Sequence, residues 1–273
     1  MHQRLVLREP VHVIGHTLVG LPAEITLRPT RSEGWWVQCG DVCRPLTGEL
    51  LGLGHHHLTM QIGELRAHIV EHLLAIRFFG LDSVCIVFDE GARVPYWGSG
   101  QHYWDQVRNS CVPDGKLTRC TFKDQFELPS HNLRKWLRFT PSEAGLLRIF
   151  VSIDYADPAI GQGVFDFTLT TEQLQRIAEA RGLGSPHWIR GMVTHLGRFG
   201  WPHAEAFTWR TQTSPAALRE ELARHRVWDL LGALAFETPA RAMLEGTIHT
   251  RIAGHADDVL CMRLLRQVGW QTL

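Results

Sequence analysis

The chain has 273 residues, 44% of them hydrophobic, and its 28 Lys and Arg residues equal its 28 Asp and Glu residues in number. This length suits one large globular domain or two smaller ones, and the balanced charge creates no general field that would attract nucleic acid or an anionic membrane. The six cysteines are sparse and lack paired CxxC spacing, which is typical of reduced thiols in a cytosolic protein.

The opening residues, MHQRLVLREP, contain no apolar region of the secretory kind. The longest apolar stretch, residues 73–88, is interrupted by Arg77 and Asp82 and is shorter than the roughly 20 residues of a membrane-spanning helix. We therefore expect a cytoplasmic protein without a membrane span. We also expect a monomer that binds no nucleic acid.

Strand and helix signals follow one another along the first half of the chain. Short runs of β-branched and aromatic residues, bounded by turn residues, predict strands at residues 11–14, 25–27, 35–38 and 83–89. Apolar residues at helical spacing predict helices at residues 63–79 and 102–108. The polar stretch 112–118, with a proline, an aspartate and a glycine, is the predicted linker.

The second half repeats this order of strands before helices, which suggests two halves of one design. Strands are predicted at residues 136–140, 146–154 and 164–169. Thr170 and Gln173 form a capping-box pattern, and Ser214 followed by Pro215 is a strong helix start. The predicted helices span residues 170–180, 214–234 and 257–267.

One pair of polar residues on the predicted helix 214–234 has the spacing of metal ligands. His225 and Asp229 are four residues apart, so they lie on one face of the helix, one turn apart, where both can bind one cation. The chain has 16 histidines, so a pair with this spacing also arises by chance. The pair alone leaves a metal site and an incidental arrangement both open.

The segment HIVEH, from His68 to His72, offers a different metal site. On a helix, its two histidines share a face beside Glu71, which matches the H-x-x-E-H signature of inverted zinc peptidases, where both histidines bind zinc and the glutamate is the base. Those peptidases have a longer chain and need a further glutamate downstream. Glu143 is the candidate for that glutamate, but its spacing fits poorly. An inverted zinc peptidase is therefore the alternative function.

Seven blocks spread along nearly the whole chain carry a family resemblance. They are LPAEITLRP (21–29), VEHLLA (70–75), GLDSVCIVFDEGARVP (80–95), IDYADPAIG (153–161), IAEAR (177–181), RHRVWDLLG (224–232) and GHA (254–256). In the same order, they resemble blocks of the UDP-3-O-acyl-N-acetylglucosamine deacetylases of lipid A biosynthesis. No single block is specific, but together they include both candidate ligand segments. The resemblance favours a zinc deacetylase over a peptidase.

The resemblance implies a role for five residues. His72, His225 and Asp229 correspond to the family's three zinc ligands, which leave a fourth position for water. Glu71 corresponds to the general base and His255 to the cationic general acid. Zinc polarises an amide carbonyl and lowers the pKa of its water toward about 7, so these residues make a complete set for amide hydrolysis.

The chain departs from the family pattern where catalysis is supported and substrate is bound. Gly182 replaces a threonine that helps the oxyanion. Ala233 replaces an aspartate that orients the acid histidine, which leaves that role to Asp257, Asp258 or another acid. The early glycine-rich element survives only as GHTLVG, residues 15–20, and a later element as WGS, residues 97–99. We therefore expect that the best substrate is not the lipid A precursor.

Residues 182–213 correspond to the segment that builds the family's acyl-chain passage, and they are rich in aromatic rings. An apolar or sugar-stacking wall and ordinary packing of these rings are both open. Arg226 stands where the family has a lysine near the substrate's phosphates, and it is expected to pair with an anion. The substrate-contacting candidates are Arg226, Gly182, Leu183, Trp188 and Trp201.

With the family fold, the doubled order of elements predicts an α+β protein of two similar domains, each a two-layer α/β sandwich, with the active site between them. Residues 1–116 supply Glu71 and His72, and residues 117–273 supply His225, Asp229 and His255. The predicted function is a zinc-dependent deacetylase that cleaves the N-acyl amide of an N-acetylated amino sugar, either free or within a nucleotide sugar. A substrate-binding relative without turnover is a further alternative, beside the peptidase that uses His68 and His72.

Overall fold

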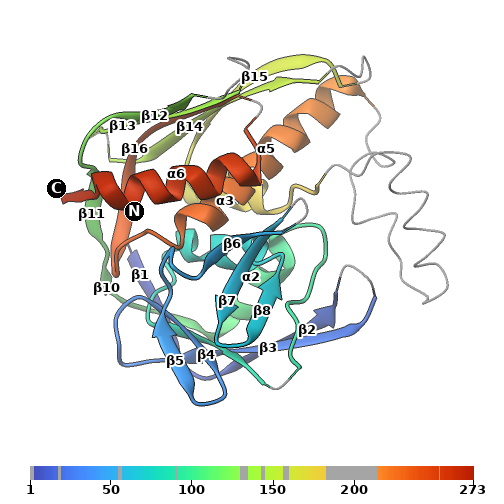
Figure 1. The fold of residues 1–273 in the computed structure, drawn as a ribbon, viewed down its shortest axis with the longest axis vertical. Helices are drawn as coiled ribbons and strands as arrows, with labels where there is room; N and C mark the ends of the chain where they lie inside the picture. The colour runs from blue at the N-terminus through green and yellow to red at the C-terminus, as the bar shows by residue number, and fades with distance from the viewer. Residues whose placement is uncertain are drawn as a thin grey trace.

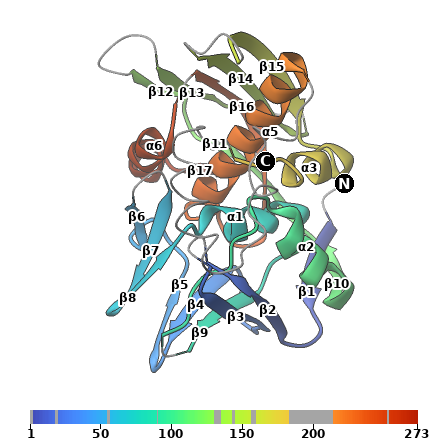
Figure 2. The same cartoon turned by 90° about the vertical axis from the view of Figure 1, so that its right-hand side faces the viewer.

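A computed structural model describes residues 3–17, 20–54, 57–89, 91–129, 135–142, 145–155, 160–182, 214–251 and 253–273. Within these residues the fold is a mixed α+β arrangement of four sheets and five α-helices. Both views of the ribbon show the helices in the middle of the molecule with strands on either side of them (Figures 1 and 2). The mixed α+β class predicted from the sequence is confirmed.

Three sheets are built from strands of the first part of the chain. Their strands are β1 (Gln3–Leu7), β2 (Val11–His16), β3 (Pro22–Pro29), β4 (Trp35–Cys39), β5 (Val42–Pro45), β6 (Leu51–Leu53), β7 (Leu58–Ile62), β8 (Leu65–His68), β9 (Val84–Phe88) and β10 (Cys111–Lys116). The largest of the three has five strands in the order β2-β3-β9-β4-β5. A second sheet has the order β6-β7-β8, and β1 pairs with β10 alone.

A seven-stranded sheet is built from strands of the second part of the chain. Its strands are β11 (Thr118–Phe122), β12 (Phe126–Pro129), β13 (Trp136–Thr140), β14 (Leu147–Asp154), β15 (Gln162–Thr168), β16 (Ala242–Arg251) and β17 (Trp270–Thr272). The long strand β16 organises the sheet because its first half pairs with β11 and its second half lies between β13 and β14. Strands before Leu117 and strands after it thus belong to different sheets. The division into two domains after residue 116 stays a prediction.

One long helix forms the centre of the helical layer. The helices are α1 (Glu71–Leu74), α2 (Gln101–Val107), α3 (Thr171–Ala178), α5 (Pro215–Leu234) and α6 (His255–Val268), with short 3-10 helices at η1 (Ala75–Phe79) and η2 (Arg108–Ser110). Helix α5 packs against α1, α3, α6 and β14. Residues 227–234 of α5 are all buried, which is expected for a helix surrounded by neighbours on every side.

Several sequence predictions are confirmed by local structure. The predicted strands at residues 11–14, 25–27, 35–38, 83–89, 136–140, 146–154 and 164–169 coincide with β2, β3, β4, β9, β13, β14 and β15. The Thr170 hydroxyl accepts a hydrogen bond from the Gln173 amide at 3.1 Å, and the Ser214 hydroxyl accepts one from the Ala217 amide at 3.2 Å. These caps begin α3 and α5 as predicted, although α3 ends at Ala178, short of the predicted end at Ala180.

The predicted helix over residues 63–79 is wrong in its first half. Ile62 pairs with Leu65, so Gly63 and Glu64 form a tight turn between β7 and β8, and Gly63 has a positive φ of 55°. The segment 65–68 alternates between outward and buried side chains, as a strand does. Ile69, with a φ of 58°, then redirects the chain, and helix begins only at Glu71.

The predicted linker at residues 112–118 is not an irregular segment, although the division between the sheets falls within it. Most of it belongs to β10, which pairs antiparallel with β1, and Thr118 already begins β11. Pro113 and Gly115 suggested a turn, but a proline is tolerated in a two-stranded sheet because one side of each strand needs no ladder partner. The tertiary contact with the chain's first strand decides the conformation of this segment.

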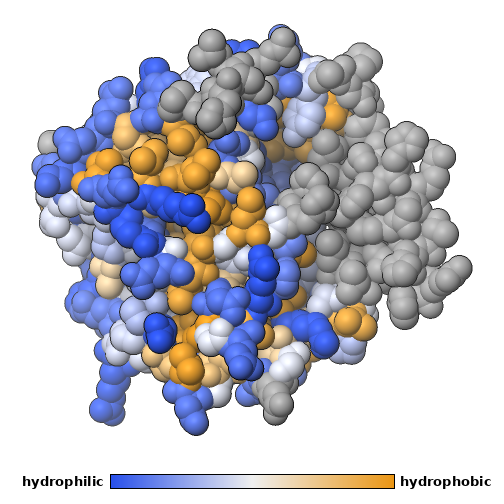
Figure 3. Space-filling view, viewed as in Figure 1, coloured by the Kyte–Doolittle hydropathy of each residue, from blue (hydrophilic) through white to orange (hydrophobic). Residues whose placement is uncertain are grey.

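Hydrophilic side chains cover much of the face seen in Figure 3, and hydrophobic residues gather in a band through its middle. Val164 on β15 is 73% exposed and Ile14 on β2 is 62% exposed, which makes them the most exposed large hydrophobic residues of the described part of the chain. They belong to different sheets. Single exposed hydrophobic residues of this kind are ordinary on protein surfaces.

Candidate metal centre and active site

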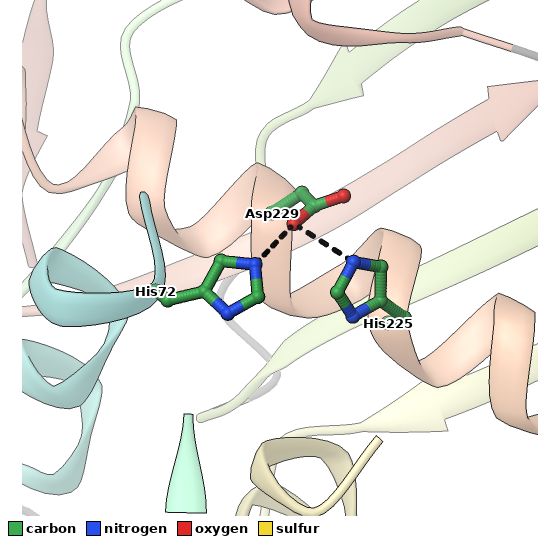
Figure 4. Close-up of side chains that lie close together, drawn as sticks. All are labelled: His72, His225 and Asp229. Atoms are coloured by element: carbon green, nitrogen blue, oxygen red, sulfur yellow. Dashed lines mark ion pairs between the residues drawn. The ribbon is translucent and has the colours of Figure 1, made fainter. Parts of the chain in front are cut away.

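Two helices bring the predicted metal ligands together. Helix α1 begins with Glu71 and His72, which are 2% and 3% exposed, and it packs against α5. On α5, His225 and Asp229 lie one helical turn apart on the same face. The rings of His72 and His225 both point toward the Asp229 carboxylate (Figure 4).

The three side chains converge on a small volume. Nε2 of His72 lies 3.6 Å from Oδ1 of Asp229, and Nε2 of His225 lies 3.5 Å from the same oxygen. The centroids of the two imidazole rings are 5.1 Å apart. One donor atom from each residue lies within 4.8 Å of the other two, so a single cation can contact all three.

The donor atoms fit a bound metal ion better than they fit hydrogen bonds to one another. The separations of 3.5 and 3.6 Å are long for hydrogen bonds but close to the about 3.3 Å between ligand atoms that each lie about 2.0 Å from a tetrahedral Zn²⁺. Oδ1 of Asp229 is buried and accepts no hydrogen bond from the described residues. A buried carboxylate oxygen without a partner is costly, and a metal ion would satisfy it.

The backbone after α3 supports one of the ligands. Nδ1 of His225 lies 3.2 Å from the Ala180 carbonyl oxygen. When Nδ1 donates its proton to that carbonyl, Nε2 keeps a free lone pair directed at Asp229. Gly182 lies beside the same ring, because a β-carbon on it would come 3.1 Å from Nε2 of His225. The backbone N–H of Gly182 donates to the Gly98 carbonyl at 3.3 Å.

The electrostatic surroundings of His72 and Asp229 favour the protonation states that metal binding requires. Burial and the neighbouring His225 lower the pKa of His72 to about 3, so its ring is neutral at physiological pH. Burial opposes the charge on Asp229, but the attraction of His225, His255 and further cationic groups outweighs it and lowers the pKa of Asp229. A neutral imidazole and an ionised carboxylate are the forms that bind metals.

Glu71 lies beside this group as a second buried carboxylate. Its Oε2 accepts a hydrogen bond from the Leu58 amide at 3.1 Å, and its Oε1 lies 3.8 Å from Nε2 of His255. Burial first, and then the charge of Asp229, raise the pKa of Glu71 well above its usual value. A carboxyl with a raised pKa is suited to take up and release a proton.

His255 closes the site from α6. Its Nε2 lies 3.8 Å from Oδ2 of Asp229, so Glu71, Asp229 and His255 also form a compact group. Its other nitrogen, Nδ1, lies 3.8 Å from Oδ2 of Asp258. The guanidinium of Arg226 donates to both carboxylate oxygens of Asp258, with an Nη1–Oδ2 distance of 2.7 Å. The role of Arg226 toward a substrate anion stays a prediction.

The structure does not form the H-x-x-E-H helix on which the peptidase alternative depends. His68 belongs to β8, where its side chain is exposed, and His72 belongs to α1. Nδ1 of His68 lies 2.8 Å from Nε2 of His57, away from the group around Asp229. The assignment of His68 and His72 to one metal is therefore wrong, because a turn at Ile69 separates the strand from the helix.

Tyr96 is a residue of the site that the sequence did not single out. Its ring centroid lies 5.4 Å from that of His72, and it is buried. Burial and the charges of Asp229 and Glu71 raise the pKa of its hydroxyl, so Tyr96 is neutral at physiological pH. It directly follows the block that ends at Pro95, but no periodicity or spacing marked it.

The remaining predicted contacts fall outside the described part of the chain. These residues are Leu183, Trp188 and Trp201. Their predicted roles toward a substrate stay predictions. Of the residues predicted in that aromatic segment, Gly182 is described, and it lies next to the candidate ligand His225.

Two histidines and a carboxylate whose donor atoms converge, with a second carboxylate and a third histidine beside them, define a candidate metal-dependent hydrolase. The family model of UDP-3-O-acyl N-acetylglycosamine deacetylase matches residues 4–267. The chain belongs to this deacetylase family, which confirms the resemblance found in the sequence. No match was found among curated proteins. In the described part of the chain, no helix has the length and apolar composition that crossing a membrane requires.

Proposed function

We propose that the chain is a zinc-dependent deacetylase that hydrolyses the N-acyl amide of an N-acetylated amino sugar. One observation carries this proposal: Oδ1 of Asp229 is buried without a hydrogen-bond partner among the described residues, between the Nε2 atoms of His72 and His225. The membership of the chain in a deacetylase family supports the same chemistry. The peptidase is no longer a candidate, because His68 lies outside this group.

His72, His225 and Asp229 are the residues that would hold the metal. Two imidazoles and one carboxylate are donors that Zn²⁺ favours, and three protein ligands are usual where the metal is catalytic. When bound, zinc supplies Lewis-acid polarisation of the amide carbonyl and lowers the pKa of water toward about 7. The buried position of His72 and Asp229 excludes competing solvent from two of the donors.

Glu71 is the proposed general base. Its Oε2 is held by the Leu58 amide, which leaves Oε1, the oxygen that faces His255, to take the proton of the attacking water. The raised pKa of Glu71 makes it a stronger proton acceptor than an ordinary carboxylate. The hydrogen bond to Leu58 fixes the carboxylate for this step.

His255 is the proposed general acid. Nε2 faces the space between Glu71 and Asp229, where the amide nitrogen of a substrate would leave. As the C–N bond breaks, its electron pair stays on nitrogen, and the proton on Nε2 moves to that nitrogen. The products are an amine and a carboxylic acid, which loses its proton to solvent, and the proton taken up by Glu71 restores His255 through the leaving amine or through solvent.

The substrate class is proposed from the family and from the residue beside His225. The description of the family names its substrate, an acylated nucleotide sugar that carries an N-acetyl group. In this chain Gly182, next to His225, offers no hydroxyl to an oxyanion. A lost oxyanion donor is worth roughly 2.7 to 4 kcal/mol in other enzymes, and it would slow hydrolysis of any N-acyl substrate. Because the chain also departs from the family pattern at residues 15–20 and 97–99, we propose that a simpler N-acetylated sugar is preferred over the acylated nucleotide sugar.

The test is hydrolysis by the zinc-loaded protein. Release of acetate or of free amine is measured for UDP-3-O-acyl-N-acetylglucosamine, for UDP-N-acetylglucosamine and for simpler N-acetylated sugars, with Asp229→Ala as the control. We expect zinc-dependent release that Asp229→Ala abolishes, with the highest kcat/KM on a simpler sugar. A preference for the acylated nucleotide sugar would refute the proposed specificity. Tight binding of any panel member without hydrolysis would instead favour a binding protein, which the replacement at Gly182 makes a real alternative.

A further inference from the structure

The ring of His255 lies between two sets of carboxylates. Nε2 faces the site, at 3.8 Å from Oε1 of Glu71 and 3.8 Å from Oδ2 of Asp229. Nδ1 faces the opposite way, at 3.8 Å from Oδ2 of Asp258. Nδ1 is buried, and it has no hydrogen-bond partner among the described residues. Nδ1 therefore faces a carboxylate that is itself held by other contacts.

Asp257 and Asp258, the two acidic residues after His255, make different contacts. Oδ2 of Asp257 accepts a hydrogen bond from the Gly254 amide at 2.8 Å, which caps the first turn of α6. Asp258 has no exposed surface and points into the protein. Only Asp258 directs a carboxylate at Nδ1 of His255. The structure thus separates two candidates that the sequence left equivalent.

Arg226 of α5 holds Asp258 in place. Nη1 of Arg226 donates to Oδ2 of Asp258 at 2.7 Å, and Nη2 donates to Oδ1. Burial opposes the charge on the guanidinium, yet the Asp258 carboxylate raises the pKa of Arg226, so the guanidinium keeps its charge. A two-pronged contact fixes the plane of the carboxylate as well as its position. Oδ2, the oxygen held by Nη1, is the one that faces His255.

We propose that Asp258, held by Arg226, is the positioning residue of His255. A carboxylate facing Nδ1 favours the ring orientation that places a proton on Nδ1 and directs Nε2 at the site. His255 then delivers the proton of Nε2, while the proton of Nδ1 stays on the ring and Asp258 stays ionised. Arg226, the residue after His225 in α5, thereby couples the helix of two metal ligands to the helix of the acid. This inference rests on the proposed function.

The kinetic test is a double-mutant cycle in the zinc-loaded protein. Asp258→Asn is expected to lower kcat by about 10- to 100-fold, as losses of outer partners of active-site histidines do, with KM and zinc content unchanged. Asp257→Asn is the matched control, and it is expected to leave kcat within about twofold because an asparagine oxygen still accepts the cap. In the His255→Ala background, Asp258→Asn is expected to change kcat little, because Asp258 acts through His255. An equal loss in both backgrounds would overturn the proposal.

A spectroscopic readout keeps the inference separate from the activity. In long-range ¹H–¹⁵N correlation spectra of histidine-labelled protein, the His255 signal is identified by its loss in His255→Ala. We expect a protonated Nδ1 in the wild type and a changed Nδ1 signal in Asp258→Asn but not in Asp257→Asn. An unchanged His255 signal in Asp258→Asn would overturn the positioning role even in an active enzyme. If the protein gives the expected NMR signals but hydrolyses no N-acyl sugar, the proposed function is refuted and the positioning role of Asp258 is not.

A second variant controls for misfolding of Asp258→Asn. Asp258→Asn leaves the buried guanidinium of Arg226 without its counterion, which is destabilising. The double variant Arg226→Gln, Asp258→Asn removes both charges and leaves two amides that can bond to each other. It is expected to fold and to show the same changed Nδ1 signal of His255 as Asp258→Asn. A wild-type signal in this variant would overturn the proposal.

Discussion

Gly232 of α5 lies so close to Glu71 of α1 that a β-carbon on the glycine would come 2.3 Å from the Glu71 carbonyl oxygen and 2.5 Å from its Cα atom. Such a contact with backbone atoms leaves no room for any side chain. His72 follows Glu71 in α1, and Asp229 precedes Gly232 in α5. The close approach of the two helices at Gly232 therefore sets the distance between these two candidate ligands.

We expect Gly232→Ala to destabilise the protein. Alanine in a helix interior favours the folded helix over glycine by up to about 1 kcal/mol. Overpacking a tight contact costs about 1–3 kcal/mol, and here backbone atoms must move. The net effect on the free energy of unfolding is a loss, and zinc content falls with the shifted ligands. Thermal unfolding and metal analysis measure both. Gly254→Ala is the control for zinc content, since a β-carbon at Gly254 meets no atom within 4 Å, although alanine is less favourable than glycine at this N-cap of α6.

The second prediction concerns the ligands. His225→Ala and Asp229→Ala are expected to remove most of the zinc that the wild type retains after purification, because each deletes one of three convergent donors. His68→Ala is the matched control, because His68 is exposed on β8 and lies outside the group. Metal content is measured after dialysis against a weak chelator. Zinc kept by the first two variants but lost from His68→Ala would reverse the assignment.

Removal of the metal is expected to lower the melting temperature of the wild type. An ion that binds the folded protein and not the unfolded chain stabilises the folded state, by about 2.7 kcal/mol when its concentration is a hundred times its Kd. Without the ion, Oδ1 of Asp229 is left buried and unsatisfied. Calorimetry with and without a chelator measures the shift. Asp229→Ala is expected to show almost no shift, and an equal shift in that variant would place the stabilising ion elsewhere.

The last prediction concerns catalysis. Glu71→Gln keeps the shape of the side chain and its contact with the Leu58 amide, but it loses the base. We expect zinc content to stay at the wild-type level and kcat to fall by at least about a hundredfold, since general bases contribute 10² to 10⁴. His255→Ala is likewise expected to keep its zinc and to lose kcat by at least about a hundredfold. Normal turnover by Glu71→Gln on the preferred substrate would show that another group takes the proton.

Local sequence patterns were sufficient for several parts of this structure. The start of α5 followed from Ser214 and Pro215, because a cap and a proline act on the backbone of the next turn. The shared face of His225 and Asp229 followed from their spacing, because the helical repeat alone places residues four apart on one side. Both inferences concern residues within one turn of each other. The order of blocks along the chain likewise identified the family, which the match to residues 4–267 confirms.

What the sequence left open depended on contacts between distant segments. Residues 65–68 have the apolar spacing of a helix, but pairing with β7 makes them a strand and removes His68 from the site. Asp257 and Asp258 are both acids, and only the placement of Arg226 on the facing helix shows which one turns toward His255. Spacing along the chain describes one element at a time. The partner of a strand or of a buried charge is set by packing, which is decided by the whole fold.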